Sequence, residues 1–249
     1  MRVAALYDIH GNVPALEAVL RDAQNDGVDE FVIGGDVLPG PMPRDALALL
    51  HSLDRPAHFI HGNGESAVLA HLAGREIDVP ERFREIIVWN AQQLDAEQQQ
   101  WLQSWPTTIQ LEVPGIGAVL FCHATPRNDT DIFTRETPVD RLLPLFSRVN
   151  AQIVVCGHTH MQFDRRAGHL RVVNAGSIGM PFASPGAYWL RLGPDVELRH
   201  TAYDLHAAAT RIRACDYPQA DEFAATAILQ PRTEQDMLRL YSGVELPPA

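Results

Sequence analysis

The sequence predicts an α/β protein in which parallel strands are covered by helices. In the first third of the chain, apolar runs of strand length alternate with segments that carry helix signals. The composition, 46% hydrophobic and 20% charged, is that of an ordinary globular protein. The 249 residues suffice for one large domain or two small ones.

The first five elements follow from local signals. Asn12 is a natural N-cap, and Pro14 lies in the first turn of the helix behind it. Gly34 and Gly35 close the second apolar run, and a Pro-rich turn at 39–43 precedes the next helix. The elements expected are a strand at 3–7, a helix from Asn12 to about Asn25, a strand at 31–33, a helix at 44–52 and a strand at 57–60.

Helices and β-rich runs are more mixed in the remainder. Helices are expected over most of 64–105, with an amphipathic one at 81–94, and over 138–149. Strands are expected at 107–113, 118–122, 153–155, 170–173, 187–192 and 196–201. Because no internal repeat or clear linker is found, we expect one domain over 1–249. Its helical C-terminal extension, 204–249, ends in an irregular Pro-rich tail.

The net charge limits the classes of partner. It is −11, and no basic run is present, so a nucleic acid polymer is not expected as a partner. A small phosphorylated ligand stays open, because two divalent cations would reverse the sign of the field locally.

The cysteines and the N-terminus indicate the compartment. Cys122, Cys156 and Cys215 are too few and too scattered for a disulfide framework or a cysteine-based zinc site. No signal peptide is visible, and no apolar stretch is long enough to span a bilayer. We therefore expect a cytoplasmic protein with no membrane partner.

Seven side chains of metal-ligand type lie in five short segments, most of them just behind a strand-like run. They are Asp8, His10, Asp36, Asn63, His123, His158 and His160. Ligands gather at the carboxyl ends of strands in open α/β sheets, and residues i and i+2 of a strand point to one side. We therefore expect these segments to converge, with Asp8 and His10 facing one point.

The ligand types indicate a reaction as well as a metal. Oxygen and imidazole ligands without a thiolate suit divalent Mn, Fe, Ni or Zn, of which Mn is favoured here. Seven ligands exceed a four-coordinate site and fit two metals that share one carboxylate. Such a pair of metals typically catalyses phosphoryl transfer or hydrolysis.

The ordered segments Asp8-Ile9-His10, Gly35-Asp36, Gly62-Asn63, His123 and Gly157-His158-Thr159-His160 resemble those of the calcineurin-like metallophosphoesterases. The segments at 8–12 and 35–41 look like the small bacterial and archaeal phosphodiesterase branch. The resemblance implies a four-layer αββα sandwich with a two-metal centre. It places Asp8, His10 and His160 on the first metal, Asn63, His123 and His158 on the second, and Asp36 between them.

The same resemblance implies that a hydroxide bridging the metals attacks phosphorus in line. We assign Asp36, Asn63 and His123 to catalysis, and Arg127, Asn63 and Gly64 to substrate contacts. Gly64 is a departure, because many relatives carry there a histidine that protonates the leaving group. Its loss predicts dependence on good leaving groups, or an acid from elsewhere in the chain. Gly64→His is expected to help poor leaving groups most.

These features predict a binuclear phosphoesterase that acts on small or nucleotide-like phosphodiesters or pyrophosphate-type bonds. A dinucleoside polyphosphate hydrolase, a general phosphomonoesterase and a non-catalytic scaffold are the alternatives. The C-terminal helices fit a lid or a dimer contact, so a homo-oligomer also stays open.

Overall fold

The computed structural model of the chain describes residues 1–77, 79–244 and 246. In this part of the chain the strands form two five-stranded sheets. The first has the order β10-β9-β1-β2-β3, with bounds Val196–Thr201, Ala187–Leu192, Val3–Leu6, Glu30–Ile33 and Ala57–Phe59. The second has the order β4-β5-β6-β8-β7, with bounds Thr108–Val113, Gly117–Cys122, Ile153–Cys156, Leu170–Asn174 and Phe163–Ala167.

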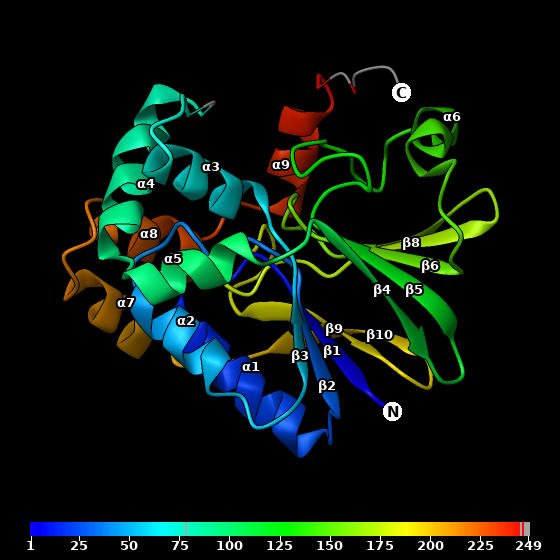
Figure 1. Cartoon of the computed structure of the whole chain (residues 1–249), viewed down its shortest axis with the longest axis horizontal. Coiled ribbons are helices and arrows are strands. Elements are labelled where there is room, and N and C mark those ends of the chain that lie inside the picture. The colour runs from blue at the N-terminus through cyan, green and yellow to red at the C-terminus, as the bar shows by residue number, and fades with distance from the viewer. Residues whose placement is uncertain (78, 245, 247–249) are drawn as a thin grey trace.

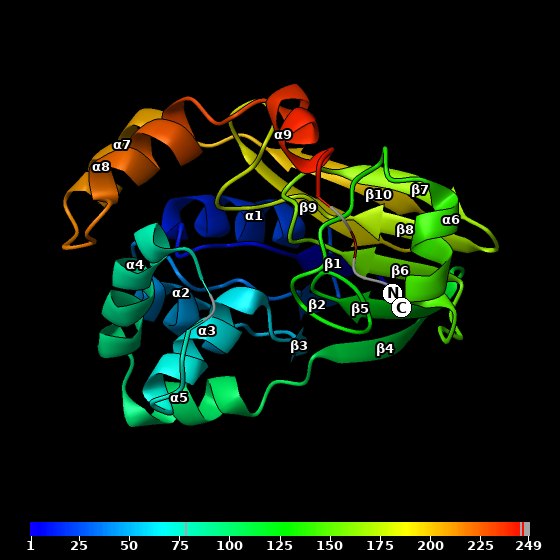
Figure 2. The same cartoon turned by 90° about the horizontal axis from the view of Figure 1, so that it is seen from above.

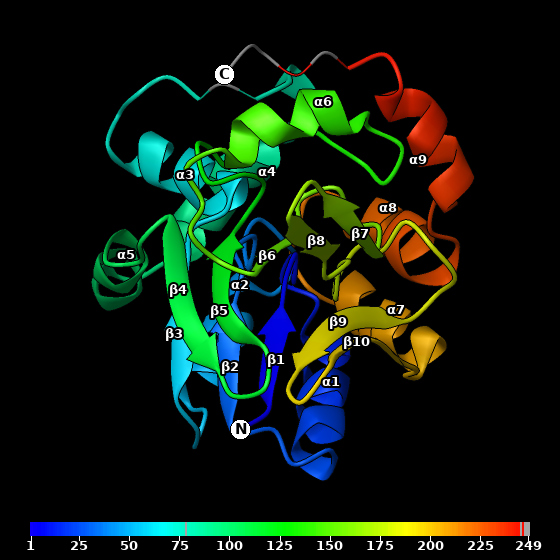
Figure 3. The same cartoon turned by 90° about the vertical axis from the view of Figure 1, so that its right-hand side faces the viewer.

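The predicted parallel strands are confirmed in the first sheet. β1 pairs in parallel with β2, in a register that sets Val3 beside Glu30 and Leu6 beside Ile33, and β2 pairs in parallel with β3. β9 joins the other edge of β1 in the antiparallel sense. Figure 3 shows β1 rising from the N-terminus towards the side of the molecule where α6 and α9 lie.

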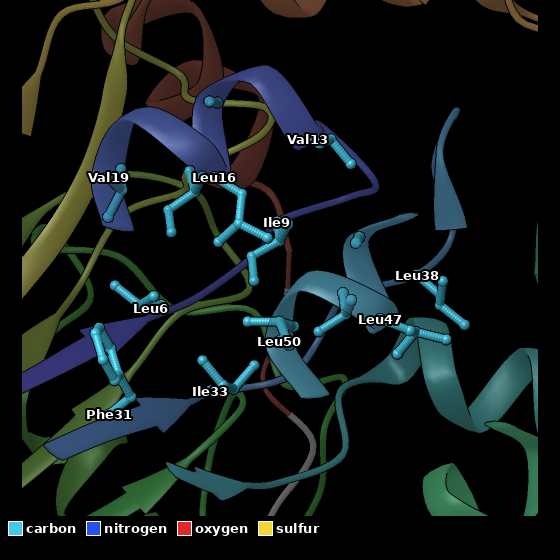
Figure 4. Close-up of a cluster of buried hydrophobic side chains, with 14 of the residues drawn as sticks. Leu6, Ile9, Val13, Leu16, Val19, Phe31, Ile33, Leu38, Leu47 and Leu50 are labelled. Atoms are coloured by element: carbon cyan, nitrogen blue, oxygen red, sulfur yellow. The ribbon is translucent and has the colours of Figure 1, made fainter. Parts of the chain in front are cut away.

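Alternate side chains of β1 enter two different cores, as a strand buried on both faces requires. Ala4 and Leu6 pack against helices, in the cluster of which Figure 4 shows a part. Val3, Ala5 and Tyr7 face the second sheet and pack with its apolar side chains. β1 therefore contributes to one core layer under the helices and to another between the sheets.

Helices cover the outer faces of both sheets (Figure 1). α1 (Val13–Asn25) and α2 (Pro43–His51) cover the first sheet. The Asn12 side chain accepts from the Ala15 N–H and so caps α1 as expected. α6 (Val139–Leu142) and the 3₁₀ helix η1 (Leu143–Phe146) pack on the second sheet. The expected four-layer αββα sandwich is confirmed.

Two further groups of helices lie beside the sandwich. One comprises α3 (Asn63–Leu72), α4 (Glu81–Gln93) and α5 (Ala96–Gln103). The other comprises α7 (Leu205–Arg213), α8 (Ala220–Phe223), the π-helix η2 (Ala224–Leu229) and α9 (Glu234–Tyr241). Ile86 of α4 packs in one apolar cluster with Phe223 and Ile228, so the C-terminal helices meet α4 (Figure 2).

Three local expectations need correction. β7 was not expected, because three of its five residues are charged: Asp164, Arg165 and Arg166. The helix expected over 138–149 is shorter and tightens into a 3₁₀ turn that contains Pro144. β1 ends at Leu6 and β3 at Phe59, each one residue before the expected end. Most of the expected Pro-rich tail lies outside the described residues.

No helix among residues 1–77, 79–244 and 246 combines the length and the apolar character needed to cross a membrane.

Candidate metal centre

The backbone is strained at five of the seven predicted ligands. Asp8, His10, Asp36, His158 and His160 have φ between 47° and 65°. Among the non-glycine residues that the structure describes, positive φ occurs at these five alone. This left-handed conformation costs free energy for residues with a Cβ, and such strain clusters at functional sites.

The convergence of Asp8 and His10 has a different cause from the one expected. Strand alternation cannot place them, because β1 has ended and both residues are left-handed. Instead the loop after β1 is bonded to the loop after β2: the Asp8 N–H donates to the Gly35 carbonyl at 3.1 Å, and the His10 N–H to the Asp36 carbonyl at 2.9 Å. The two strand ends are thereby held in register.

One group of ligand-type side chains comprises Asp8, His10 and His160, all buried, with their ligand atoms within 4.8 Å of one another. His160 Nε2 lies 3.3 Å from Asp8 Oδ1 and 3.2 Å from His10 Nε2. Asp8 Oδ2 accepts from the His158 N–H at 2.9 Å, whereas the buried Asp8 Oδ1 has no hydrogen-bond partner. An orphaned carboxylate oxygen beside two imidazoles is what a cation would satisfy.

A second group comprises Asp8, Asp36 and His123. His123 Nε2 lies 3.5 Å from Asp36 Oδ1, and Asn63 Oδ1 lies 3.1 Å from the same nitrogen. The other oxygen of Asp36, Oδ2, lies 3.8 Å from His10 Nε2. Each oxygen of the Asp36 carboxylate therefore faces a different histidine.

Backbone carbonyls fix the orientation of the imidazoles. In three of them Nδ1 meets a carbonyl oxygen: His10 with Pro39 at 3.1 Å, His123 with Gly34 at 2.9 Å and His160 with Met180 at 2.7 Å. A carbonyl oxygen only accepts, so Nδ1 must carry the proton and Nε2 presents its lone pair in the neutral ring. Histidines that bind metals have this arrangement. The fourth, His158, bonds to the backbone of Thr130 and lies 5.2 Å from His123, ring centre to ring centre.

Burial and neighbouring charges shift the protonation of these groups. Burial lowers the pKa of both His10 and His158 to about 3, which leaves the rings neutral and able to ligate. Burial, together with the carboxylates Glu65 and Asp8, raises the pKa of Asp36 to about 7. The pKa of His123 is raised, because Asp36 and Asp8 outweigh the opposite effect of burial.

The donor set contains no thiolate. Cys122 and Cys156 are buried, their thiols point at the carbonyls of Ala124 and Val173, and burial raises the pKa of both. The remaining nitrogen and oxygen donors fit Mn²⁺, Fe²⁺, Ni²⁺ or Zn²⁺. The residues present therefore fit the metal that the sequence predicted.

Glu65 is a residue that the sequence reasoning did not use. Its side chain is completely buried and accepts three backbone N–H groups, from Asp36, Gly62 and Leu38, at 2.8, 2.8 and 2.9 Å. One carboxylate thus ties the loop after β2 to the start of α3. The available signal was its place three residues after Gly62, where an acidic side chain returns to the N-cap N–H.

Gly64 lies against the backbone of the neighbouring loop. Its N–H donates to Asp36 Oδ1 at 2.7 Å. A Cβ at this position would lie 1.9 Å from the Leu38 carbonyl oxygen. A histidine therefore cannot be added here without displacing that loop, and the expectation that Gly64→His restores a proton donor needs correction.

Arg127 is bound to its own loop. Its guanidinium donates to both oxygens of Asp131, at 2.6 and 2.8 Å, and Thr125 donates to the same carboxylate. Arg127 does not line the cavity at the ligand cluster. Its proposed contact with substrate stays a prediction.

A cavity of about 360 Å³ opens directly on the cluster. The predicted site residues that line it are His10, Asp36, Asn63, Gly64, His158 and His160. Asp8 and His123 lie behind them, at 0% and 1% exposure. The arrangement presents imidazole nitrogens and one carboxylate to a small ligand.

Comparison with known proteins gives the class of this site. A model of the calcineurin-like phosphoesterase superfamily domain matches residues 1–192. The chain therefore belongs to the calcineurin-like phosphoesterase superfamily, and it is a metal-dependent phosphoester hydrolase. The resemblance found in the sequence is confirmed.

Individual relatives share the fold over most of their length. An uncharacterised protein of Methanocaldococcus jannaschii is 28% identical over 72% of this chain and 76% of its own. A metallophosphoesterase from Sphaerobacter thermophilus has a TM-score of 0.71 and 25% identity over 92% of this chain and 99% of its own. A hypothetical protein from Pyrococcus horikoshii has a TM-score of 0.77 and 19% identity over 93% of this chain and 99% of its own.

Proposed function

We propose that the chain binds two divalent cations and hydrolyses small or nucleotide-like phosphodiesters, with pyrophosphate-type bonds as the related substrates. The observation that carries the proposal is the Asp36 carboxylate, one oxygen of which faces His10 at 3.8 Å and the other His123 at 3.5 Å. A carboxylate whose two oxygens face two different imidazole groups is suited to join two metals.

The proposed ligand sets follow from these neighbours. Asp8, His10 and His160 hold the first ion, Asn63, His123 and His158 hold the second, and Asp36 belongs to both. Asp8 also lies between the groups, because its Oδ1 is 3.3 Å from His160 Nε2 and 3.8 Å from His123 Nε2. Asp36 is preferred as the bridge because each of its oxygens faces a different histidine and Gly64 fixes one of them.

The residues of the chain position the reaction. When bound, the ions activate water and offset charge on the phosphoryl oxygens. Asn63 and His123 set one side of the cluster, and the carbonyl-anchored imidazoles keep their Nε2 atoms directed inward. Residue 64 carries no side chain to protonate a leaving group, so we expect good leaving groups to react far faster than poor ones.

The test is hydrolysis of bis-p-nitrophenyl phosphate by the whole chain after addition of Mn²⁺, with Fe²⁺, Ni²⁺ and Zn²⁺ in parallel. Turnover that chelation removes and Mn²⁺ restores supports the proposal. Absence of turnover with every metal and with p-nitrophenyl phosphate as well would refute it and favour a scaffold role.

Other expectations stay predictions. They are the preference for Mn²⁺, a cytoplasmic location and the absence of a nucleic acid partner, and a homo-oligomer stays open.

A further inference from the structure

The cavity at the ligand cluster extends well beyond the proposed ligands. One of its walls is apolar and comes from α4 and the segment before it: Val79, Phe83, Ile86 and Ile87. Phe83 retains 38% exposure, so no other part of the described chain covers its ring fully. A large apolar side chain at the mouth of a cavity is a typical contact for an uncharged part of a ligand.

A second part of the lining is aromatic and comes from distant parts of the chain. Tyr217 and Phe223 approach from the C-terminal helices, with ring centres 6.2 Å apart. Phe182 stacks on His160 at 4.9 Å with an interplanar angle of 21°, so one aromatic ring borders the proposed ligands directly.

The two walls are joined, which makes the cavity a formed site. Gln219 Nε2 donates to the Arg82 carbonyl at 3.1 Å, across 137 positions of the sequence. The ring of Trp89 meets that of Tyr217 edge to face at 5.3 Å. A site whose walls are already packed loses little entropy when a ligand enters.

The charge of the lining limits what can enter. The described lining residues include the carboxyl groups of Asp36 and Glu222 but neither lysine nor arginine. Arg82 lies over the Phe83 ring at 4.7 Å without lining the cavity itself. A second phosphate in this space would lose its hydration without gaining a cationic partner.

We infer that the cavity formed by α4 and the C-terminal helices binds an uncharged aromatic or alkyl arm of the substrate while the phosphate lies at the ligand cluster. The inference rests on the proposed phosphodiesterase function and narrows it. It selects diesters with one apolar arm over dinucleoside polyphosphates and other pyrophosphate-type substrates. The inference also gives the C-terminal extension a role in substrate recognition.

The first test varies one arm and keeps the leaving group. The kcat/KM values of methyl, phenyl and 2-phosphoethyl p-nitrophenyl phosphate are compared in the Mn²⁺-loaded protein. Burial of a phenyl ring predicts a preference of about tenfold or more for phenyl over methyl, and a rate below methyl for the arm with a second phosphate. Equal rates for methyl and phenyl, or a preference for the charged arm, would overturn the inference.

Replacement of Phe83 tests whether the apolar wall causes the preference for the phenyl ester. Phe83→Ala is expected to reduce the phenyl-to-methyl ratio several-fold, because the methyl ester has no arm that would contact Phe83. The fold should persist, since Phe83 is far from fully buried. Leu198→Ala on β10 removes an equally exposed side chain, 40% against 38%, outside the cavity lining and is the matched control. A ratio unchanged in Phe83→Ala would refute the assignment of this wall.

A binding measurement separates failure of the cavity from failure of the proposed function. Phenylphosphonate and methylphosphonate are titrated calorimetrically into the Mn²⁺-loaded protein at several temperatures. Tighter binding and a more negative heat-capacity change for the phenyl compound support the apolar cavity even if no ester is hydrolysed. If methyl p-nitrophenyl phosphate is hydrolysed and the two phosphonates bind alike, the proposed function stands and the inference fails.

Discussion

The Nε2 atoms of His10 and His160 lie 3.2 Å apart, while the Nδ1 atom of each ring meets a backbone carbonyl. Since the carbonyls take the Nδ1 protons, two neutral rings would point lone pairs at each other. Both nitrogens would hold a bound cation, and the unpartnered Asp8 Oδ1 lies 3.3 Å from one of them. The pKa of His160 is raised, because Asp8 outweighs the opposite effect of burial, so in the metal-free protein a proton on His160 Nε2 can take the place that the cation would fill.

Asp36→Asn is expected to lower kcat/KM by about a thousandfold, because the loss of a bridging charge costs several kcal/mol of transition-state stabilisation. The asparagine can still accept from the Gly64 N–H, so the fold should persist. Kinetics on bis-p-nitrophenyl phosphate and metal content by elemental analysis check this. Asp54→Asn, at an exposed position, is the control. Unchanged turnover in Asp36→Asn would contradict the bridge.

Glu65→Gln tests the carboxylate that holds two loops together. A glutamine keeps one acceptor oxygen but places an NH₂ group against a backbone N–H, so we expect a loss of about 1–3 kcal/mol in unfolding free energy. Metal affinity should fall about 10–100-fold, because the Asp36 backbone loses its support. Denaturant unfolding and Mn²⁺ titration measure the two effects. Glu97→Gln, on the exposed side of α5, is the control and should change neither the unfolding free energy nor the Mn²⁺ affinity. If Glu65→Gln also changes neither, Glu65 does not position the site.

Gly64→Ala should already damage the site. Its Cβ would press on the Leu38 carbonyl, and overpacking of this kind costs about 1–3 kcal/mol. We expect lower thermal stability and weaker activity, with Gly64→His worse and giving no selective help to poor leaving groups. Gly243→Ala is the control, since a Cβ there meets nothing within 4 Å. A Gly64→His protein that is stable and gains rate on poor leaving groups would show that the loop can move.

Metal binding should release a proton below neutral pH. The pKa of Asp36 is raised to about 7 in the metal-free protein, so its carboxyl group is largely protonated at pH 6 and ionised at pH 8. Metal needs the ionised carboxylate and a neutral His123, whose pKa is also raised, so Mn²⁺ affinity should rise between pH 6 and 8. Calorimetry in two buffers of different ionisation enthalpy counts the protons. Equal Mn²⁺ affinity at pH 6 and pH 8, with no proton released, would contradict the predicted rise of affinity with pH.

The fold could be predicted where local chemistry and burial agree. The β1 run is apolar on both faces, and Asn12 caps the helix that follows, so both elements were expected. β7 was not predicted because its outward residues are charged: Asp164 pairs with Arg171 of the neighbouring strand β8. An edge strand that carries charge lacks the apolar pattern on which sequence reasoning depends.

The candidate site was predictable in its residue types and not in its geometry. The order of aspartates, asparagine and histidines indicated the proposed ligands, but the local sequence did not predict a left-handed backbone at Asp8 or His10. The clash that defines Gly64 comes from Leu38, 26 positions away, and the aromatic wall comes from residues beyond 180. Such relations arise only when distant loops are brought together.

A crystal structure of the protein soaked with Mn²⁺, with an anomalous difference map recorded at the manganese edge, tests the central claim most directly. The account predicts two peaks about 3.5–4 Å apart, one beside His10 and His160, the other beside Asn63 and His123, with Asp36 between them. A single peak, or two peaks that Asp36 does not join, would contradict it.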